Sequence, residues 1–237
     1  MPEDLVRRYE TDLRFPQVSH KYRRFQFDML SSCEQYRKWW DSEKSALFIL
    51  DGHSLKAGPD NSDRFWASTA VFDLLEILRD SQSELVLHYF IELEESMIYD
   101  VPSHKIFSHL IWQILKHDPH LVRNTTCIQE LKSLAHSANW QAEDPRDPCR
   151  IIQSLADHAS SIYIVLDRID RCNCYLTVLI DRLLWLVTES KNTVKIFATL
   201  GERSSKIVDL KKFDDNPQFM RVRLNQMKRR ADPIIDV

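Results

Sequence analysis

The chain has 237 residues, of which 43% are hydrophobic and 28% charged, a composition typical of a globular protein with a buried core. The formal net charge of -3 excludes a strong overall attraction to nucleic acid or to an anionic membrane. No apolar run is long enough to span a membrane, and the charged start at residues 1–13 lacks the apolar stretch of a signal peptide. We therefore expect a soluble, cytoplasmic protein.

The five cysteines do not form the pattern of a disulfide framework. Cys172 and Cys174 are too close for a relaxed disulfide, and no second cysteine pair completes a metal site with them. Reduced thiols are the expected state.

The first part of the chain, residues 1–42, is expected to form an N-terminal arm and a helix over 30–40 that lead into the domain. Arginines in this arm alternate with aromatic residues, a composition that can bind nucleic acid. Acidic residues dilute the charge, so packing of the arm on the domain is favoured instead. The remainder, residues 43–237, is expected to form one domain.

Within this domain, apolar runs of strand length alternate with helical patterns. Strands are predicted at 46–51, 84–93, 161–167, 193–200 and 219–224. Helices are predicted at 64–79, from Ser103 onward, around 128–135, at 148–159 and at 175–189, with an exposed loop at 139–148. Such alternation predicts a three-layer α/β fold, with a mostly parallel central sheet of about five strands covered by helices on both faces.

The loop after the first predicted strand contains two of the chain's three glycines, Gly52 and Gly58. A glycine loop between a strand and a helix aims backbone N–H groups at phosphate. A working P-loop reads G-x-x-x-x-G-K-S/T, with lysine on the terminal phosphates and the hydroxyl on magnesium. This loop has one residue too many between its glycines, and Pro59 and Asp60 replace the lysine and the hydroxyl residue. Proline lacks an amide donor, and aspartate repels phosphate.

Lys56 and Ser62 are possible substitutes for the missing lysine and hydroxyl groups. The candidate phosphate-binding residues are therefore Gly52, Lys56, Gly58 and Ser62. A plain surface turn is the alternative, and spacing alone favours that turn.

Two aspartates follow the third predicted strand, in the segment Asp-Arg-Ile-Asp-Arg. Because an aspartate at this position orients magnesium and its waters in P-loop enzymes, Asp167 and Asp170 are candidate Mg²⁺ ligands. Arg171 occupies the place of the carboxylate that would position the attacking water, and arginine cannot accept a proton. The alternative is that both aspartates only pair with neighbouring arginines. After the fourth strand, Arg203 is available to sense a γ-phosphate, but a lone arginine on a loop is more often solvated. No residue is assigned a catalytic role.

In their order along the chain, these segments resemble the NACHT-type NTPase domains of fungal NOD-like receptor proteins. These are also described as nephrocystin-3-like N-terminal domains, and they belong to the STAND class of signal-transducing P-loop ATPases. The resemblance rests on segments 12–25, 46–58, 86–93 with 103–119, 162–172, 194–204 and 222–237.

The departures from the family's motifs concentrate at the chemical end of the site. The Walker A lysine and serine have no counterpart after Gly58, the Walker B glutamate falls on Arg171, and the arginine of the family's "TSRP" segment falls near Gly201. The resemblance therefore implies a degenerate NACHT/STAND-type P-loop domain that does not hydrolyse ATP. It would act as a signalling or scaffolding module with protein partners in a signalling assembly, and no bound cofactor is expected.

Two other functions remain open. One is an ATP-binding STAND NTPase whose irregular loop holds ATP or ADP with Mg²⁺. The other is a nucleic-acid-binding module that uses the basic arm together with the clusters at 211–212 and 228–230. Nucleic acid is the less favoured partner, because acidic residues outnumber basic ones.

Overall fold

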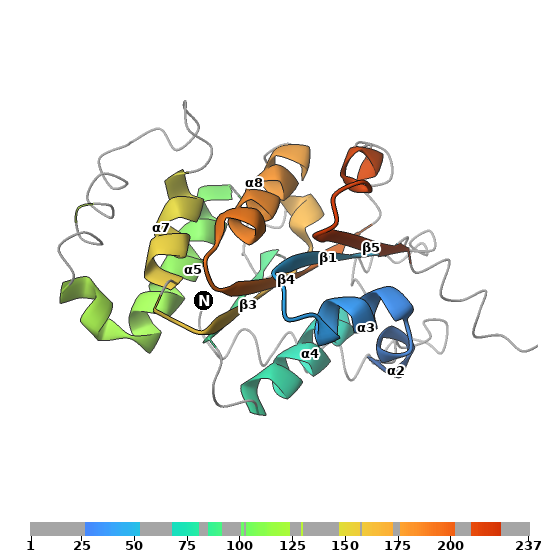
Figure 1. Ribbon diagram of the computed structural model, residues 1–237, viewed down its shortest axis with the longest axis horizontal. Coiled ribbons are helices and arrows are strands. Elements are labelled where there is room, and N and C mark those ends of the chain that lie inside the picture. The colour runs from blue at the N-terminus through green and yellow to red at the C-terminus, as the bar shows by residue number, and fades with distance from the viewer. Residues whose placement is uncertain are drawn as a thin grey trace, which may run out of the picture.

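The computed structural model describes residues 27–52, 68–80, 85–91, 101, 103–123, 129, 147–156, 158–172, 176–201 and 210–223. In these ranges one sheet of five parallel strands lies between two layers of helices (Figure 1). The predicted three-layer α/β fold is confirmed. None of the described helices is both long and apolar enough to cross a membrane.

The strand order is β2-β3-β4-β1-β5. The strands are β1 (Ala46–Asp51), β2 (Leu85–Phe90), β3 (Ser161–Asp167), β4 (Thr193–Leu200) and β5 (Phe219–Arg223). β1 is buried along its whole length, as expected for a parallel strand covered on both faces.

The helices divide between the two faces of the sheet (Figure 1). On one face lie α2 (Phe27–Ser31), α3 (Glu34–Asp41) and α4 (Ser68–Asp80), and on the other α5 (Ser103–His117), α7 (Asp147–Ala156) and α8 (Leu176–Glu189). For α4, α5, α7 and α8, which connect strands, this division follows from the right-handed crossover rule. The chain moves across the sheet in one direction from β1 to β2 and in the opposite direction from β2 through β3 and β4 to β5. Right-handed connections in opposite directions must use opposite faces.

Three 3-10 turns complete the described elements: η2 (Pro119–Arg123), η3 (Ile169–Arg171) and η4 (Leu210–Phe213). The sequence patterns did not predict these turns. The single helix predicted at 30–40 is wrong, because the chain forms α2 and α3 with a break between them. At the break, the hydroxyls of Ser31 and Ser32 donate to the Asp28 and Met29 carbonyls, and Cys33 has extended backbone angles.

Several predicted features lie outside the described residues. They are the arm before residue 27, the helix around 128–135 apart from Gln129, the loop at 139–146 and the basic cluster at 228–230.

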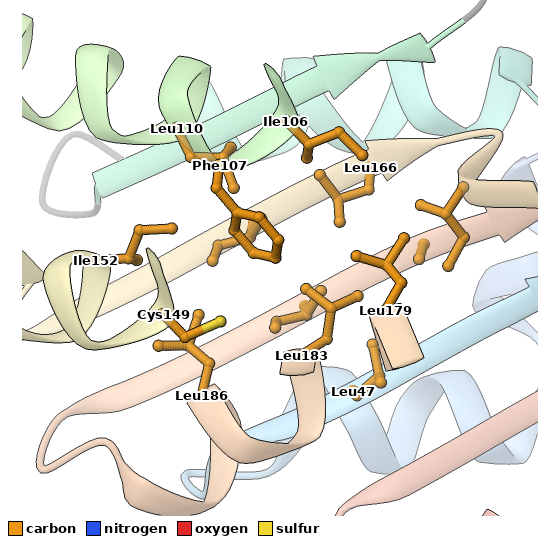
Figure 2. Packing of buried hydrophobic residues seen from close by; sticks show 14 of the residues in the cluster. Leu47, Ile106, Phe107, Leu110, Cys149, Ile152, Leu166, Leu179, Leu183 and Leu186 are labelled. Atoms are coloured by element: carbon orange, nitrogen blue, oxygen red, sulfur yellow. The ribbon is translucent and has the colours of Figure 1, made fainter. Parts of the chain in front are cut away.

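The larger hydrophobic core lies between the sheet and the helices α5, α7 and α8. Figure 2 shows Phe107 from α5, Ile152 from α7 and Leu183 from α8 in one layer over the sheet, and Leu166 of β3 belongs to the same cluster. Cys149 lies in the same layer, where its Sγ donates to the Arg182 carbonyl at 3.6 Å. Burial raises the pKa of the Cys149 thiol to about 12, so it stays protonated at neutral pH.

The core under α2, α3 and α4 is rich in aromatic rings. Because side chains alternate along a strand, Phe48 of β1 faces this core while Leu47 and Ile49 face the other. We call the rings around α3 the aromatic cluster: Tyr36, Trp39, Trp40, Phe48, Tyr163 and Phe197. Trp39 is fully buried at its centre, and its indole N–H donates to the Ala46 carbonyl at 3.2 Å.

A buried lysine attaches α3 to the sheet. Lys195 of β4 donates from Nζ to the carbonyl of Trp40 at 2.6 Å and lies over the rings of Trp39 and Tyr163 at 5.9 and 5.8 Å. A cation at the last turn of a helix stabilises the unpaired carbonyls there, and the rings face it with their electron-rich surfaces.

The edge strand β2 is protected by a side chain of α5. The amide of Gln113 accepts a hydrogen bond from the His88 backbone N–H at 3.1 Å and donates to the His88 carbonyl at 2.7 Å. This pairing satisfies backbone groups that an exposed edge would offer to another strand.

We expect the buried His88 imidazole to make the stability of the protein depend on pH. Burial lowers the pKa of His88 to about 4, with Arg79 as the next cause. The unfolded chain takes up this proton near pH 6.5 and the folded chain does not, so the free energy of unfolding falls as the pH drops below 6.5. We expect a loss of up to ~2 kcal/mol between pH 6.5 and pH 5, measured by urea unfolding.

His88→Gln should flatten this part of the pH profile, because the unfolded variant has no imidazole to protonate. The exposed His120 provides the control, and His120→Gln should leave the profile as in the parent. An unchanged slope in His88→Gln would show that other groups cause the acid loss of stability.

Candidate functional site

The topology of the sheet indicates where a ligand would bind. The chain leaves β1 toward α4 on one face and leaves β4 toward η4 on the other. Neighbouring parallel strands whose connections depart to opposite faces open a crevice at their carboxyl ends, and α/β sheets bind ligands there. The candidate site is therefore the edge where β1 and β4 end.

Gly52 lies at this point, directly after β1. Its backbone N–H donates to the Leu200 carbonyl at 2.9 Å, which continues the pairing of β1 with β4 by one residue. The first predicted phosphate-binding residue thus lies at the expected edge, with its N–H bonded to the sheet. The other three, Lys56, Gly58 and Ser62, lie outside the described residues, as does Arg203.

A buried hydroxyl joins the ends of β3 and β4. Oγ1 of Thr199 donates to Oδ1 of Asp167 at 2.6 Å, and Oγ1 in turn accepts from the Arg168 backbone N–H at 2.9 Å. Asp167 and Thr199 are both fully buried. The first candidate magnesium ligand is therefore hydrogen-bonded to the neighbouring strand.

The second candidate ligand, Asp170, is held in a buried ion pair with Arg168. The guanidinium donates from Nε to Oδ1 at 3.3 Å and from Nη2 to Oδ2 at 3.4 Å. Oδ1 also accepts from the Gly201 backbone N–H at 2.8 Å. The two side chains are 5% and 1% exposed, so the pair is shielded from water.

Two features of the backbone accommodate the Arg168 side chain. Arg168 has φ 59° and ψ 48°, and among the described residues it is the one non-glycine residue with positive φ. A β-carbon on Gly201 would lie 2.7 Å from Cζ and Nε of Arg168, closer than such atoms pack. Glycine at 201 therefore allows the guanidinium to lie against the backbone after β4.

A third carboxylate, Asp51, ends β1 and pairs with β5. Arg221 donates to its Oδ2 from Nε at 3.0 Å and from Nη2, and Nε of Arg223 lies 3.7 Å from the same oxygen. Asp51 is 2% exposed, whereas the Arg223 side chain is 46% exposed. These residues were not assigned to the site from the sequence. The alternating arginines at the end of β5 could have indicated a carboxylate partner on the neighbouring strand.

Arg171 is the last residue of η3. Its carbonyl accepts from the Val101 backbone N–H at 3.0 Å, which links the segments after β2 and β3.

The described carboxylates do not fit a magnesium ion. Mg²⁺ requires carboxylate oxygens and waters in near-octahedral geometry. Both oxygens of Asp170 accept from a guanidinium, and Asp167 accepts from Thr199. Across the described ranges, no group of three acidic, histidine or cysteine side chains is placed to hold a metal. In this arrangement the carboxylates join the strand ends to one another.

Comparison with known families identifies the chain. The family described as nephrocystin 3, N-terminal, matches residues 27–199, which include β1, β2, β3, all of β4 but its last residue and most of the described helices. The chain belongs to this family. The nephrocystin 3 N-terminal match and the parallel sheet together make the protein a P-loop NTPase-like domain, as the sequence resemblance implied.

No curated protein matches the chain. Two solved structures of the Aeropyrum pernix ORC2 protein align with it. The ADP form has a TM-score of 0.45 and 8% identity, and the ADPNP–ADP complexes have a TM-score of 0.43 and 10% identity. Each alignment covers 90% of this chain and 51% of the ORC2 chain, so this chain spans about half the length of those proteins.

Proposed function

We propose that this nephrocystin 3 N-terminal domain is a degenerate NACHT/STAND-type module that binds nucleotide weakly or not at all and does not hydrolyse it. In this proposal it works in the cytoplasm as a signalling or scaffolding unit of a fungal signalling assembly, and its partners are proteins. The observation that carries the proposal is the pairing of Asp170 with Arg168. It places a protein cation on the carboxylate that would otherwise serve Mg²⁺.

Hydrolysis of a nucleoside triphosphate needs a metal to neutralise the phosphates and a residue to orient the attacking water. Asp167 and Asp170 accept hydrogen bonds from protein groups instead, as described above. Arg171, in the position of the Walker B glutamate, has no lone pair with which to orient water. In the loop after β1, Pro59 and Asp60 replace the phosphate-binding lysine and the hydroxyl residue.

The second candidate is an ATP-binding STAND NTPase with an irregular phosphate loop. The observation that favours it is the position of Asp51, Asp167 and Asp170 at the carboxyl edge where such sheets bind ligands. In this version Lys56 contacts the phosphates and Ser62 supplies the hydroxyl.

Calorimetric titration of the full chain with ATP and with ADP, with and without Mg²⁺, separates the two candidates. We expect no saturable heat up to millimolar nucleotide, and no thermal shift. Magnesium-dependent, saturable binding would overturn the proposal and support the second candidate.

Lys56→Ala is the matched control for any heat that is observed. Heat that disappears in this variant comes from the loop after β1, whereas heat that persists unchanged comes from another part of the chain and contradicts the second candidate.

A further inference from the structure

We propose that the Arg168 guanidinium is a built-in cation that takes the place of a divalent metal ion at the carboxyl ends of β3 and β4. The inference rests on the proposed function, because it explains how the site keeps its fold without magnesium. It assigns to Arg168 a positioning role: the guanidinium neutralises Asp170 and fixes the carboxylate against the first residue after β4.

The carboxylate of Asp170 needs a counter-ion, because an isolated charge in a water-excluded site is strongly unfavourable. Its side chain is 1% exposed, and the ion pair is made by Arg168 through both of its oxygens. The backbone N–H of Gly201 adds a third hydrogen bond. These three hydrogen bonds satisfy the carboxylate, as a bound metal ion would.

The backbone on both sides of the pair is arranged for the guanidinium. A positive φ is disfavoured for a residue with a β-carbon and persists only where the surroundings impose it. Arg168 has this conformation at the start of η3, which directs its side chain back onto Asp170. Glycine at 201 leaves the space that the guanidinium fills.

The hydroxyl of Thr199 adds to the same arrangement. It accepts from the Arg168 backbone N–H while it donates to Asp167, so the residue is held from its backbone as well as from its guanidinium. The positive φ of Arg168, the glycine at 201 and the buried hydroxyl of Thr199 thus all fix the position of the Arg168 guanidinium.

If the guanidinium replaces a metal, its removal should leave a site that responds to metal. We would record thermal unfolding of the full chain for the parent, Arg168→Met and Arg168→Lys. Each would be measured in EDTA, in Mg²⁺ and in Mn²⁺ at one ionic strength set with NaCl. The parent and Arg168→Lys should show no divalent-dependent shift. Arg168→Met should unfold at lower temperature than the parent, and either divalent ion should raise its Tm saturably by about 3 °C or more.

Two further variants assign the effect. Arg150 is exposed on α7, so Arg150→Met should behave as the parent in all conditions. Arg168→Met combined with Asp170→Asn should lose the divalent response, because the carboxylate is gone. If Arg168→Met does not fold, Gly201→Ala displaces the guanidinium while retaining Arg168, and it should acquire the same response.

A folded Arg168→Met protein whose Tm does not change with Mg²⁺ or Mn²⁺ would overturn the inference. The proposed function would still stand if the parent binds no nucleotide. Stabilisation of the parent itself by Mg²⁺ would contradict both. These outcomes therefore separate failure of the inference from failure of the proposed function.

Discussion

Replacing Trp39 with alanine is expected to lower the free energy of unfolding by ~3–5 kcal/mol. Trp39 is fully buried, and the centre of its ring lies within 6.4 Å of those of the five other rings of the aromatic cluster: Tyr36, Trp40, Phe48, Tyr163 and Phe197. The substitution leaves a cavity and removes the hydrogen bond to the Ala46 carbonyl. Urea unfolding followed by circular dichroism measures the change.

Trp112 is the matched control, because the same residue type is 50% exposed on α5. Trp112→Ala should cost less than ~1 kcal/mol, since little packing is lost. Equal costs for the two variants would contradict the central position of Trp39 in the core and the attachment of α3 to the sheet.

Replacing Asp170 with alanine is expected to cost ~3–5 kcal/mol, because one partner of a buried ion pair is removed and the other remains buried. The variant leaves the Arg168 guanidinium without its carboxylate and the Gly201 N–H without its acceptor. Without the ion pair, fewer contacts stabilise the positive φ of Arg168, so the turn η3 should open more often. Hydrogen exchange at residues 168–172 would detect this second effect.

Asp181→Ala is the control for the loss of a carboxylate. Asp181 pairs with Lys212 at 3.2 Å with both side chains about half exposed, and surface pairs of this kind contribute ~0–1 kcal/mol. An Asp170→Ala protein as stable as Asp181→Ala would mean that the buried pair contributes nothing to the stability of the strand ends.

The two sites of largest expected loss lie in different parts of the fold. Trp39 belongs to the core beneath α3, whereas Asp170 joins the ends of β3 and β4. Because they share no contact, their costs should be nearly additive in the double variant.

The strands could be predicted from the sequence to within a few residues. The predicted bounds 46–51, 161–167 and 193–200 match β1, β3 and β4. Long apolar runs rich in β-branched residues have few alternatives to a buried parallel strand, so local pattern alone defines them. The predicted helix at 30–40 fails for the opposite reason, since two serine hydroxyls interrupt a pattern whose apolar spacing continues.

The sequence by itself determined the α/β class, the three central strands and the presence of aspartates at two strand ends. Only the tertiary structure decided what those aspartates contact. The partners Asp51 and Arg221 are 170 positions apart, and Asp167 and Thr199 are 32 apart. Strand order and register bring such distant groups to one edge, and no local pattern encodes either. Strand order and register therefore decide which donors reach Asp51 and Asp167. The pair of Arg168 with Asp170 joins residues only two positions apart, and it is the alternative that the sequence left open.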